Sequence, residues 1–308
     1  MQLTTSPVHA PLANPTVVTC LAIGPEGRDV IVGQAADGDH PSLTRWSLPD
    51  LTRLPGPEPC PLSTHQDTCW VLARGGNSLL AVAGMSAQQL ILIDLSDGTQ
   101  TAPVDGDVVW AALTGSLLAS SGTHTQIADL DSGRLVWRQE PPAPRKPSHA
   151  SLAPLIAFHP NQQTFAVGGA GEPNVVVYPL SGGEPVTTLS GAPERLRWLG
   201  FGPQGRYLMA IDAYAQSTTL WRSGESEPHR PGIPETGRYR SAAFHPDGEH
   251  CVLAMRTGYV HLYRLSDGAL LDRQQHHRGR VQALSFTPDG SLLLSGGDDG
   301  KLLAWTVS

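Results

Sequence analysis

A short turn recurs at nearly regular intervals along all 308 residues of the chain. It reads, in order, GPEG (24–27), RGGN (74–77), TGS (114–116), HPNQ (159–162), GPQG (202–205), HPDG (245–248) and TPDG (287–290). Successive turns start 50, 40, 45, 43, 43 and 42 residues apart. A period of this size is typical of repeat proteins, because one such unit cannot bury its apolar faces alone. The sequence therefore predicts seven copies of one structural unit.

Each repeat contains short apolar runs separated by tight turns. A second turn recurs as SDG (96–98 and 266–268), DSG (131–133) and SGG (181–183). Runs such as LILIDL (90–95) and VVVYPL (175–180) are rich in β-branched residues and mostly too short for helices. Pro-Asp-Gly closes a hairpin well, because proline presets φ, aspartate bonds the nearby backbone and glycine accepts a positive φ. Each repeat is therefore predicted to supply about four strands.

The 33 glycines and 27 prolines are scattered along the chain, which argues against long helices. Four-stranded sheets that stand radially bury their faces against their two neighbours. We therefore expect an all-β fold, a seven-bladed β-propeller of four-stranded antiparallel blades that forms one domain over 1–308. The expected blades span approximately 12–54, 65–104, 107–138, 151–189, 194–230, 238–275 and 279–308, the last one together with 2–8. The N-terminal strand at 2–8 is expected to complete the last blade and close the ring, because an open ring leaves an unpaired edge.

The last repeat carries a recognisable motif. The stretch SGGDDGKLLAWT (295–306) resembles the end of a WD40 repeat, with Thr306 where the second aspartate usually stands. The resemblance implies a structural tetrad of linked side chains, for which the last repeat has His277, Ser295, Asp299 and Trp305 at the family spacing. Elsewhere this tetrad decays: the tryptophan position holds Trp46, Ile93, Ala128, Tyr178, Trp221 and Tyr263, and the sixth repeat has Thr257 at the aspartate position. The WD40 resemblance thus covers the whole chain as a pattern and one repeat as a full motif.

Charge is unevenly distributed along the chain. The formal net charge is −7, made of −8 in residues 1–190 and +1 in residues 191–308. Binding to nucleic acid or to an anionic membrane through overall charge is therefore not expected. No run of eighteen apolar residues and no secretory signal is visible, and the four cysteines show no CxxC spacing. We expect a monomer in the reducing environment of the cytoplasm.

Basic residues recur at one position of the last three repeats. The WD40 resemblance implies that the residues flanking the first core position of the inner strand point onto the top rim. Those pairs are Arg195/Arg197, Arg238/Arg240 and Arg280/Gln282 in the last three repeats, with Arg256 and Arg278 in adjacent loops. The corresponding pairs in the earlier repeats are Val17/Thr19, Asp67/Cys69, Asp107/Val109 and Leu152/Pro154.

The hypothesis is an arginine crescent over blades five to seven that faces an acidic rim at Asp67 and Asp107. The planar guanidinium group of arginine can donate two parallel hydrogen bonds to a carboxylate or a phosphate, so the expected ligand is an acidic or phosphorylated protein segment. The alternative is a solvated rim in which the arginines pair with Glu194, Glu235 and Asp298. Trp70 and Trp110, near the starts of inner strands, are additional contact candidates, whereas Trp46, Trp137, Trp198, Trp221 and Trp305 are expected to pack between blades.

Loop lengths favour binding on that same rim. Length varies mostly in second-to-third-strand loops, such as 33–42 and 168–174, and in the proline-rich connections 54–64, 139–150 and 225–237. In a propeller both classes of loop emerge on one face, and loops on a rigid scaffold often carry function. The alternative is that these loops merely tolerate insertions.

Signatures of catalysis are missing from the sequence. HExxH, a P-loop and Cys/His zinc spacing are absent. Asp129, Asp131 and Glu140 resemble a calcium loop only superficially, and a hairpin turn explains them better. His159 and His245 precede proline in the same turn and are interpreted as turn residues. We therefore expect no catalytic residues, no metal and no cofactor.

The pattern thus favours a non-catalytic WD40-like scaffold that binds one or more proteins through its top face. Two alternatives stay open. One is a propeller enzyme, a lactonase-like hydrolase with a metal in the channel, although few metal ligands converge at the inner-strand starts. The other is single-stranded nucleic-acid binding through the arginine rim, with Trp70 and Trp110 as stacking surfaces.

Overall fold

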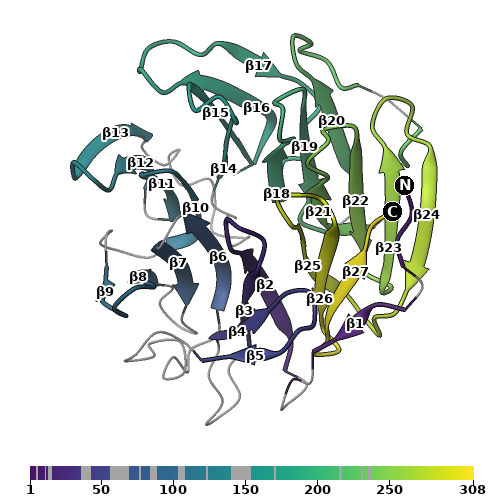
Figure 1. Ribbon diagram of the computed structural model, residues 1–308. Helices are drawn as coiled ribbons and strands as arrows, with labels where there is room; N and C mark the ends of the chain where they lie inside the picture. Colours follow the sequence, from purple (N-terminus) through teal and green to yellow (C-terminus); the bar gives the residue numbers. More distant parts are fainter. Residues whose placement is uncertain are drawn as a thin grey trace.

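The computed structural model describes residues 1–4, 6–10, 12, 16–35, 43–55, 69–75, 78–83, 89–102, 108–122, 124–139, 154–169, 171–214, 217–229, 232–234 and 238–308. Within these residues every regular element is a β-strand, which confirms the all-β prediction. The strands form seven antiparallel sheets in the described part of the chain, numbered here one to seven in chain order. Figure 1 shows these sheets standing around a common centre.

The first four sheets contain four consecutive strands each. Sheet one holds β2 (Val18–Ile23), β3 (Asp29–Gln34), β4 (Leu43–Ser47) and β5 (Arg53–Leu54). Sheet two holds β6 (Cys69–Gly75), β7 (Ser78–Ala83), β8 (Gln89–Asp94) and β9 (Gln100–Thr101). Sheet three holds β10 (Val108–Thr114), β11 (Leu117–Gly122), β12 (Thr125–Asp129) and β13 (Arg134–Gln139). Sheet four holds β14 (Leu155–Phe158), β15 (Thr164–Gly169), β16 (Glu172–Pro179) and β17 (Thr187–Leu189).

Sheet five departs from the prediction of four strands. In the described residues it has three, β18 (Leu196–Phe201), β19 (Tyr207–Asp212) and β20 (Thr218–Arg222). A single bridge between Leu220 and His229 stands where a fourth strand is expected. The following segment has proline at 228, 231 and 234, and proline cannot donate to a strand ladder, which accounts for the shortened pairing.

The last two sheets differ in how the outer strand is supplied. Sheet six holds β21 (Tyr239–Phe244), β22 (His250–Met255), β23 (Tyr259–Arg264) and β24 (Leu270–Gln275). Sheet seven holds β25 (Val281–Phe286), β26 (Leu292–Gly297), β27 (Leu302–Thr306) and, from the other end of the chain, β1 (Val8–His9). Val8 and His9 pair with Ala304 and Leu303.

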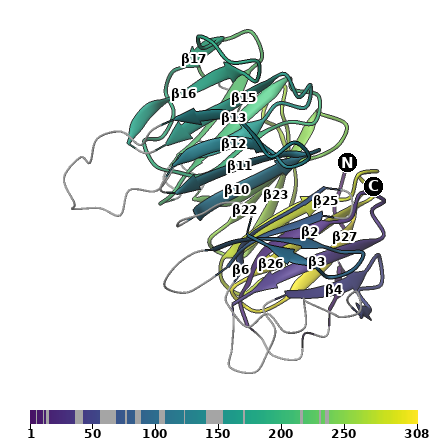
Figure 2. The same ribbon diagram turned by 90° about the vertical axis from the view of Figure 1, so that its left-hand side faces the viewer.

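The two ends of the chain lie side by side, as both views of the molecule show (Figures 1 and 2). The Gln2 amide donates to the Ser308 carbonyl at 2.7 Å, and the Ser308 amide returns a bond to the Gln2 carbonyl at 3.0 Å. Leu3 forms a further bridge with Val307 and is buried in an apolar cluster with Leu303 and Trp305. Residues 2–4 and 8–9 thus lie alongside the end of the chain.

Apolar side chains are buried between neighbouring sheets. Trp221 of sheet five packs with Val177 and Leu189 of sheet four, and Tyr239 of sheet six packs with Met209 of sheet five. The same holds between the last and first sheets, where Leu294, Leu302 and Ala304 pack with Val18, Val32 and Trp46. The first strands contact one another in the order β2, β6, β10, β14, β18, β21, β25 and again β2. Each first strand therefore contacts the first strands of two other sheets.

The recurrent turns make contact with one another as well. His245 Nδ1 accepts the Asp247 amide within its own turn, and its Nε2 lies 3.2 Å from the carbonyl of Gly290 in the turn of sheet seven. His159 Nδ1 accepts the Asn161 amide in the same way. Both histidines are thus turn residues in the described structure, and they also connect neighbouring sheets.

Candidate functional site

Six of the first strands contain a β-bulge at the same place. The register between the first and second strand skips one residue after Val18, Cys69, Val108, Leu196, Tyr239 and Val281. The skipped residues are Thr19, Trp70, Val109, Arg197, Arg240 and Gln282. A bulge leaves its extra residue out of the ladder and re-aims its side chain. The bulges therefore single out one residue in each of these six first strands.

This register corrects the second of the predicted rim pairs. The bulge places Trp70, not Cys69, at the position of Arg197 and Arg240, so the predicted pair Asp67/Cys69 is shifted by one residue. The physical reason is that Cys69, rather than Thr68, pairs with the second strand ahead of the bulge. Asp67 itself, Asp107, Leu152 and Glu235 lie outside the described residues, as does the side chain of Trp70. The acidic rim stays a prediction.

The bulge residues of sheets five, six and seven meet. Arg197 Nη2 donates to Gln282 Oε1 at 2.9 Å, and Arg240 Nε donates to the same oxygen at 3.0 Å. The Gln282 amide nitrogen in turn donates to Asp298 Oδ1. Asp298 Oδ2 lies 3.8 Å from Arg280 Nε. We call Arg197, Arg240, Arg256 and Arg280 the arginine cluster; Gln282 and Asp298 connect Arg197, Arg240 and Arg280, and the charge of Arg256 acts on Arg197 and Arg240.

The cluster is electrostatically crowded. The pKa of Arg197 is lowered to about 10, mainly by partial loss of hydration and to a smaller extent by repulsion from Arg240 and Arg280. The negative charge of Asp298 opposes this shift. Loss of hydration and repulsion from Arg280 and Arg256 also lower the pKa of Arg240. Both of these guanidinium groups remain charged at neutral pH. Within the described residues Asp298 is the only carboxylate that opposes these shifts, so the site carries an excess of positive charge.

A second group adjoins the cluster. Arg195 Nη1 donates to Tyr214 Oη at 2.8 Å, and the guanidinium carbon lies 5.3 Å from the centre of the Tyr214 ring. Arg256 Nη1 lies 3.4 Å from the Tyr214 carbonyl, which joins the turn of sheet six to that of sheet five. Tyr214 is 53% exposed, the kind of aromatic surface that partners use. Sequence reasoning missed Tyr214, although a tyrosine shortly after the apolar run of the second strand is its signal.

The remaining two predicted arginines contribute differently. Arg238 and Arg278 have exposed side chains. The Arg278 amide donates to Asp299 Oδ2 at 2.8 Å, and the Arg238 carbonyl lies 3.3 Å from the Arg256 amide. Arg238 has a φ of 54°, an unusual conformation for a residue with a side chain. Such strain is often found where function constrains the backbone.

The four predicted tetrad residues are joined by hydrogen bonds in sheet seven. His277 Nδ1 lies 2.9 Å from Asp299 Oδ1 and its Nε2 lies 2.8 Å from Ser295 Oγ, while Trp305 Nε1 donates to the same hydroxyl at 2.8 Å. Burial raises the pKa of Asp299, but hydrogen bonds from His277 and the Arg278 amide outweigh it, so the pKa lies below its usual value. Because Asp299 also accepts the Arg278 amide, these hydrogen bonds hold the backbone next to Arg280 in place.

The tryptophans lie mostly between sheets. Trp137 packs edge-on against Phe165, with ring centres 4.9 Å apart, and Trp198 packs beside Phe244. Trp46, Trp221 and Trp305 are almost fully buried. Trp110, a contact candidate, is half-buried against the apolar clusters around sheets three to five. Only part of its ring is therefore accessible to a partner.

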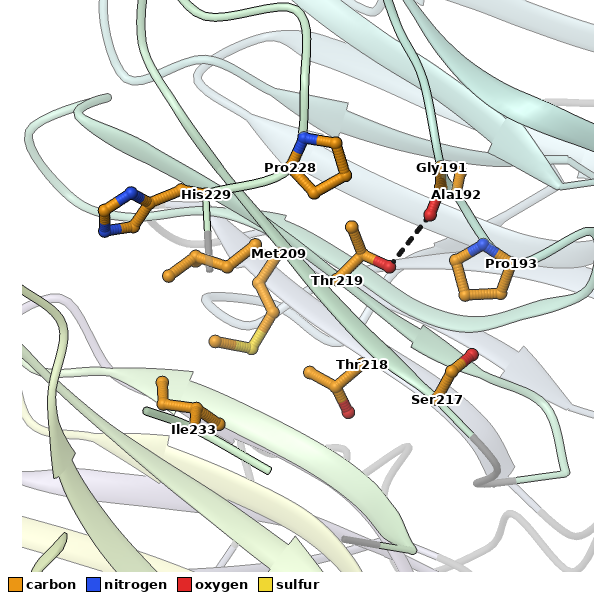
Figure 3. Close-up of a pocket in the computed structure, with 11 residues that line it drawn as sticks. Gly191, Ala192, Pro193, Met209, Ser217, Thr218, Thr219, Pro228, His229 and Ile233 are labelled. Atoms are coloured by element: carbon orange, nitrogen blue, oxygen red, sulfur yellow. Dashed lines mark hydrogen bonds between the residues drawn. The ribbon is translucent and has the colours of Figure 1, made fainter. Parts of the chain in front are cut away.

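A cavity of about 220 Å³ lies beside β20, where sheet five has only its single bridge (Figure 3). Its wall includes Ser217 through Leu220, Met209, His229 and Ile233. Thr219 Oγ1 donates to the Gly191 carbonyl at 3.1 Å. The buried Thr218 hydroxyl and His229 Nε2 have no partner among the described residues.

Two properties of the described residues bear on other classes of function. No group of three or more His, Cys, Asp or Glu side chains in this part of the chain is arranged to hold a metal ion. The same residues include no helix that could cross a lipid bilayer.

Comparison with known proteins agrees with the repeat pattern. The family model "WD domain, G-beta repeat" matches residues 268–306. Serine-threonine kinase receptor-associated protein of Homo sapiens is 34% identical over 103 residues, which cover 33% of this chain and 29% of that protein. WD repeat-containing protein 18 of Homo sapiens is 29% identical over 132 residues, 43% of this chain and 30% of that protein. The periodic tryptophan protein 2 homolog of Neurospora crassa is 33% identical over 75 residues, 24% of this chain and 8% of that protein. The matches thus span less than a third of these relatives.

Proposed function

The chain belongs to the WD40-repeat family, and on that premise we propose that it is a non-catalytic scaffold which binds an acidic or phosphorylated segment of a partner protein at the arginine cluster. The proposal is carried by one observation: Arg197 of sheet five and Arg240 of sheet six both donate to the same side-chain oxygen of Gln282 in sheet seven. Guanidinium groups gathered in this way provide directed donors for carboxylate or phosphate oxygens.

The proposed architecture behind this site is a seven-bladed propeller. The seven sheets are its blades, and β1 closes the ring by completing the last blade. Three features support this: the circular order of first-strand contacts, the apolar cluster between sheets seven and one, and the pairing of β1 with β27. The arginine cluster then lies at one end of the central axis, on the face that carries the longer loops.

The mechanism we propose is rigid display. The guanidinium groups of Arg197 and Arg240 stand on bulges of the innermost strands, and Gln282 holds both of them before any partner arrives. Little side-chain freedom is then lost on binding, which favours affinity. The exposed Arg195–Tyr214 pair extends the contact surface beyond the charged centre.

The relatives support only the general class of function. One of them is named for association with a serine-threonine kinase receptor, and the idea we carry over is binding to another protein. The identity of the partner is not part of the proposal. We also propose that the protein acts as a monomer in the cytoplasm, which is consistent with Cys251 being buried and forming no disulfide.

The test is partner capture by the triple variant Arg197→Glu, Arg240→Glu, Arg280→Glu. We expect capture to be lost while the thermal transition stays near that of the wild type, because the three side chains are at least partly exposed. The matched control is Arg28→Glu, Arg222→Glu, Arg264→Glu, which reverses the same number of exposed charges at the opposite ends of the strands. Equal capture by both triple variants would refute the proposal.

A further inference from the structure

The arginine cluster already holds an oxygen atom that belongs to the protein. Gln282 Oε1 accepts hydrogen bonds from Arg197 of sheet five and Arg240 of sheet six. An amide oxygen is a neutral acceptor, whereas guanidinium groups bond anionic oxygens about twice as strongly. An anionic ligand oxygen would therefore gain by taking the position of Gln282 Oε1.

Among the described residues, the charges around this position do not cancel. Four arginines influence one another here, Arg197, Arg240, Arg256 and Arg280, and Asp298 is the carboxylate that opposes them within the described residues. Together these five side chains carry a formal net charge of +3. Asp298 does not reach Arg197 or Arg240 directly but through the Gln282 amide. The neutral side chain of Gln282 thus lies between the Asp298 carboxylate and the guanidinium groups of Arg197 and Arg240.

We propose that this cluster binds a phosphate monoester dianion, that one phosphate oxygen replaces Gln282 Oε1, and that Asp298 acts as a built-in competitor which sets the affinity. The inference rests on the proposed function, because it names the anion that the same site prefers. A dianion compensates an excess of three positive charges better than a carboxylate does. A phosphate also presents three oxygens in different directions, which suits guanidinium groups arriving from three sheets, whereas a carboxylate has two oxygens in one plane.

A matched pair of probes distinguishes the two anions. Phenyl phosphate and benzoate share a ring and differ in the anionic group, and their binding can be followed by calorimetry or by NMR shifts of arginine side chains. We expect phenyl phosphate to bind at least tenfold more tightly at pH 7.5. Its affinity should fall toward that of benzoate below about pH 6, where the phosphate loses its second charge. Equal binding of both probes at pH 7.5 would overturn the inference and leave the scaffold function standing.

Asp298→Asn tests the competitor. The variant removes one negative charge and keeps an oxygen acceptor for the Arg280 amide, and we expect phenyl phosphate to bind roughly three- to tenfold more tightly. Glu249→Gln is the control, since it removes an exposed carboxylate at the far end of sheet six and should leave the affinity unchanged. Unchanged or weaker phosphate binding in Asp298→Asn would contradict the role of Asp298.

Gln282→Ala provides an independent test of the displaced oxygen. If Gln282 only occupies the site, its removal leaves the affinity for phenyl phosphate equal or higher. A large decrease would show that Gln282 holds the arginines in place, and the displacement step would be wrong. Arg197→Gln should abolish measurable binding, with Arg264→Gln as the control, because Arg264 lies at the other end of its strand and pairs with Asp267. Full binding by Arg197→Gln would overturn both the inference and the proposed site.

Discussion

Neighbouring threonines on β20 illustrate how a single hydroxyl contributes to stability. Thr219 donates to the Gly191 carbonyl, whereas the Thr218 hydroxyl is buried without a partner in the described residues. A buried polar group that lacks a partner loses its hydration and gains nothing in return. Two residues of the same type, one position apart, therefore have opposite expected effects.

Thr218→Val should stabilise the protein by about 1 kcal/mol, because valine has nearly the same shape and no hydroxyl to dehydrate. Thr219→Val, the control, should destabilise it by about 1 kcal/mol, because it removes a hydrogen bond. Denaturant unfolding of the two variants measures both differences. If Thr218→Val destabilises as much as Thr219→Val, the cavity beside β20 must supply a partner for the Thr218 hydroxyl, such as water or a small ligand.

At the scale of the structural element, the recurrent turn explains why the repeat is so visible in the sequence. Gly290 has a φ of 74°, and a Cβ atom added to it would lie 2.4 Å from His245 Nε2 of the preceding sheet. The same arrangement recurs at Gly205, whose added Cβ would lie 2.1 Å from His159 Nε2. Glycine is therefore required twice, for the backbone of the turn and for the contact between turns.

Gly290→Ala should destabilise the protein by about 2–3 kcal/mol, of which about 1 kcal/mol reflects the positive φ. The control is Gly182→Ala, since Gly182 has a φ of 82° but nothing within 4 Å of the added Cβ. Gly182→Ala should lower the free energy of unfolding only by the contribution of the positive φ, about 1 kcal/mol. Thermal unfolding of both variants, and of Gly290→Ala combined with His245→Ala, separates the two contributions. A double variant no more stable than Gly290→Ala would show that the imidazole contact is irrelevant.

The elements also show what sequence reasoning could and could not reach. The turn period predicted the sheets, and the spacing of His277, Ser295, Asp299 and Trp305 predicted residues that the structure joins by hydrogen bonds. The bulges were not predictable, because an extra residue in a strand has no distinct composition. In sheet two the pair was also shifted by one residue, because Cys69 rather than Thr68 pairs with the second strand. Likewise, the meeting of Arg197 with Gln282, 85 residues away, depends on the placement of whole sheets rather than on any local pattern.

At the scale of the whole molecule, the decisive interface joins the two ends of the chain. Val8 and His9 pair with β27, Leu3 is buried among residues of sheets six and seven, and the Leu3 amide donates to Asp272 Oδ2 at 2.7 Å. These contacts connect sheet seven to its neighbours through residues that are distant in sequence. If the sheets form a closed ring, each sheet is held from two sides and local loss of one contact affects all of them.

Removal of residues 2–9 should therefore lower the midpoint of thermal unfolding by at least 10 °C, which is more than the loss of one buried leucine explains. The reason is that the truncation removes the outer strand of sheet seven and exposes the edge of β27. The exposed edge should also cause association, measurable by light scattering. Leu3→Ala is the comparison: it keeps the strand pairing, removes only the buried side chain and should cost about 2–3 kcal/mol without association. A truncated protein that stays monomeric and unfolds like Leu3→Ala would mean that the first strand covers the sheet without closing a ring. The arginines of sheets five to seven would then be held in position by their own sheets alone.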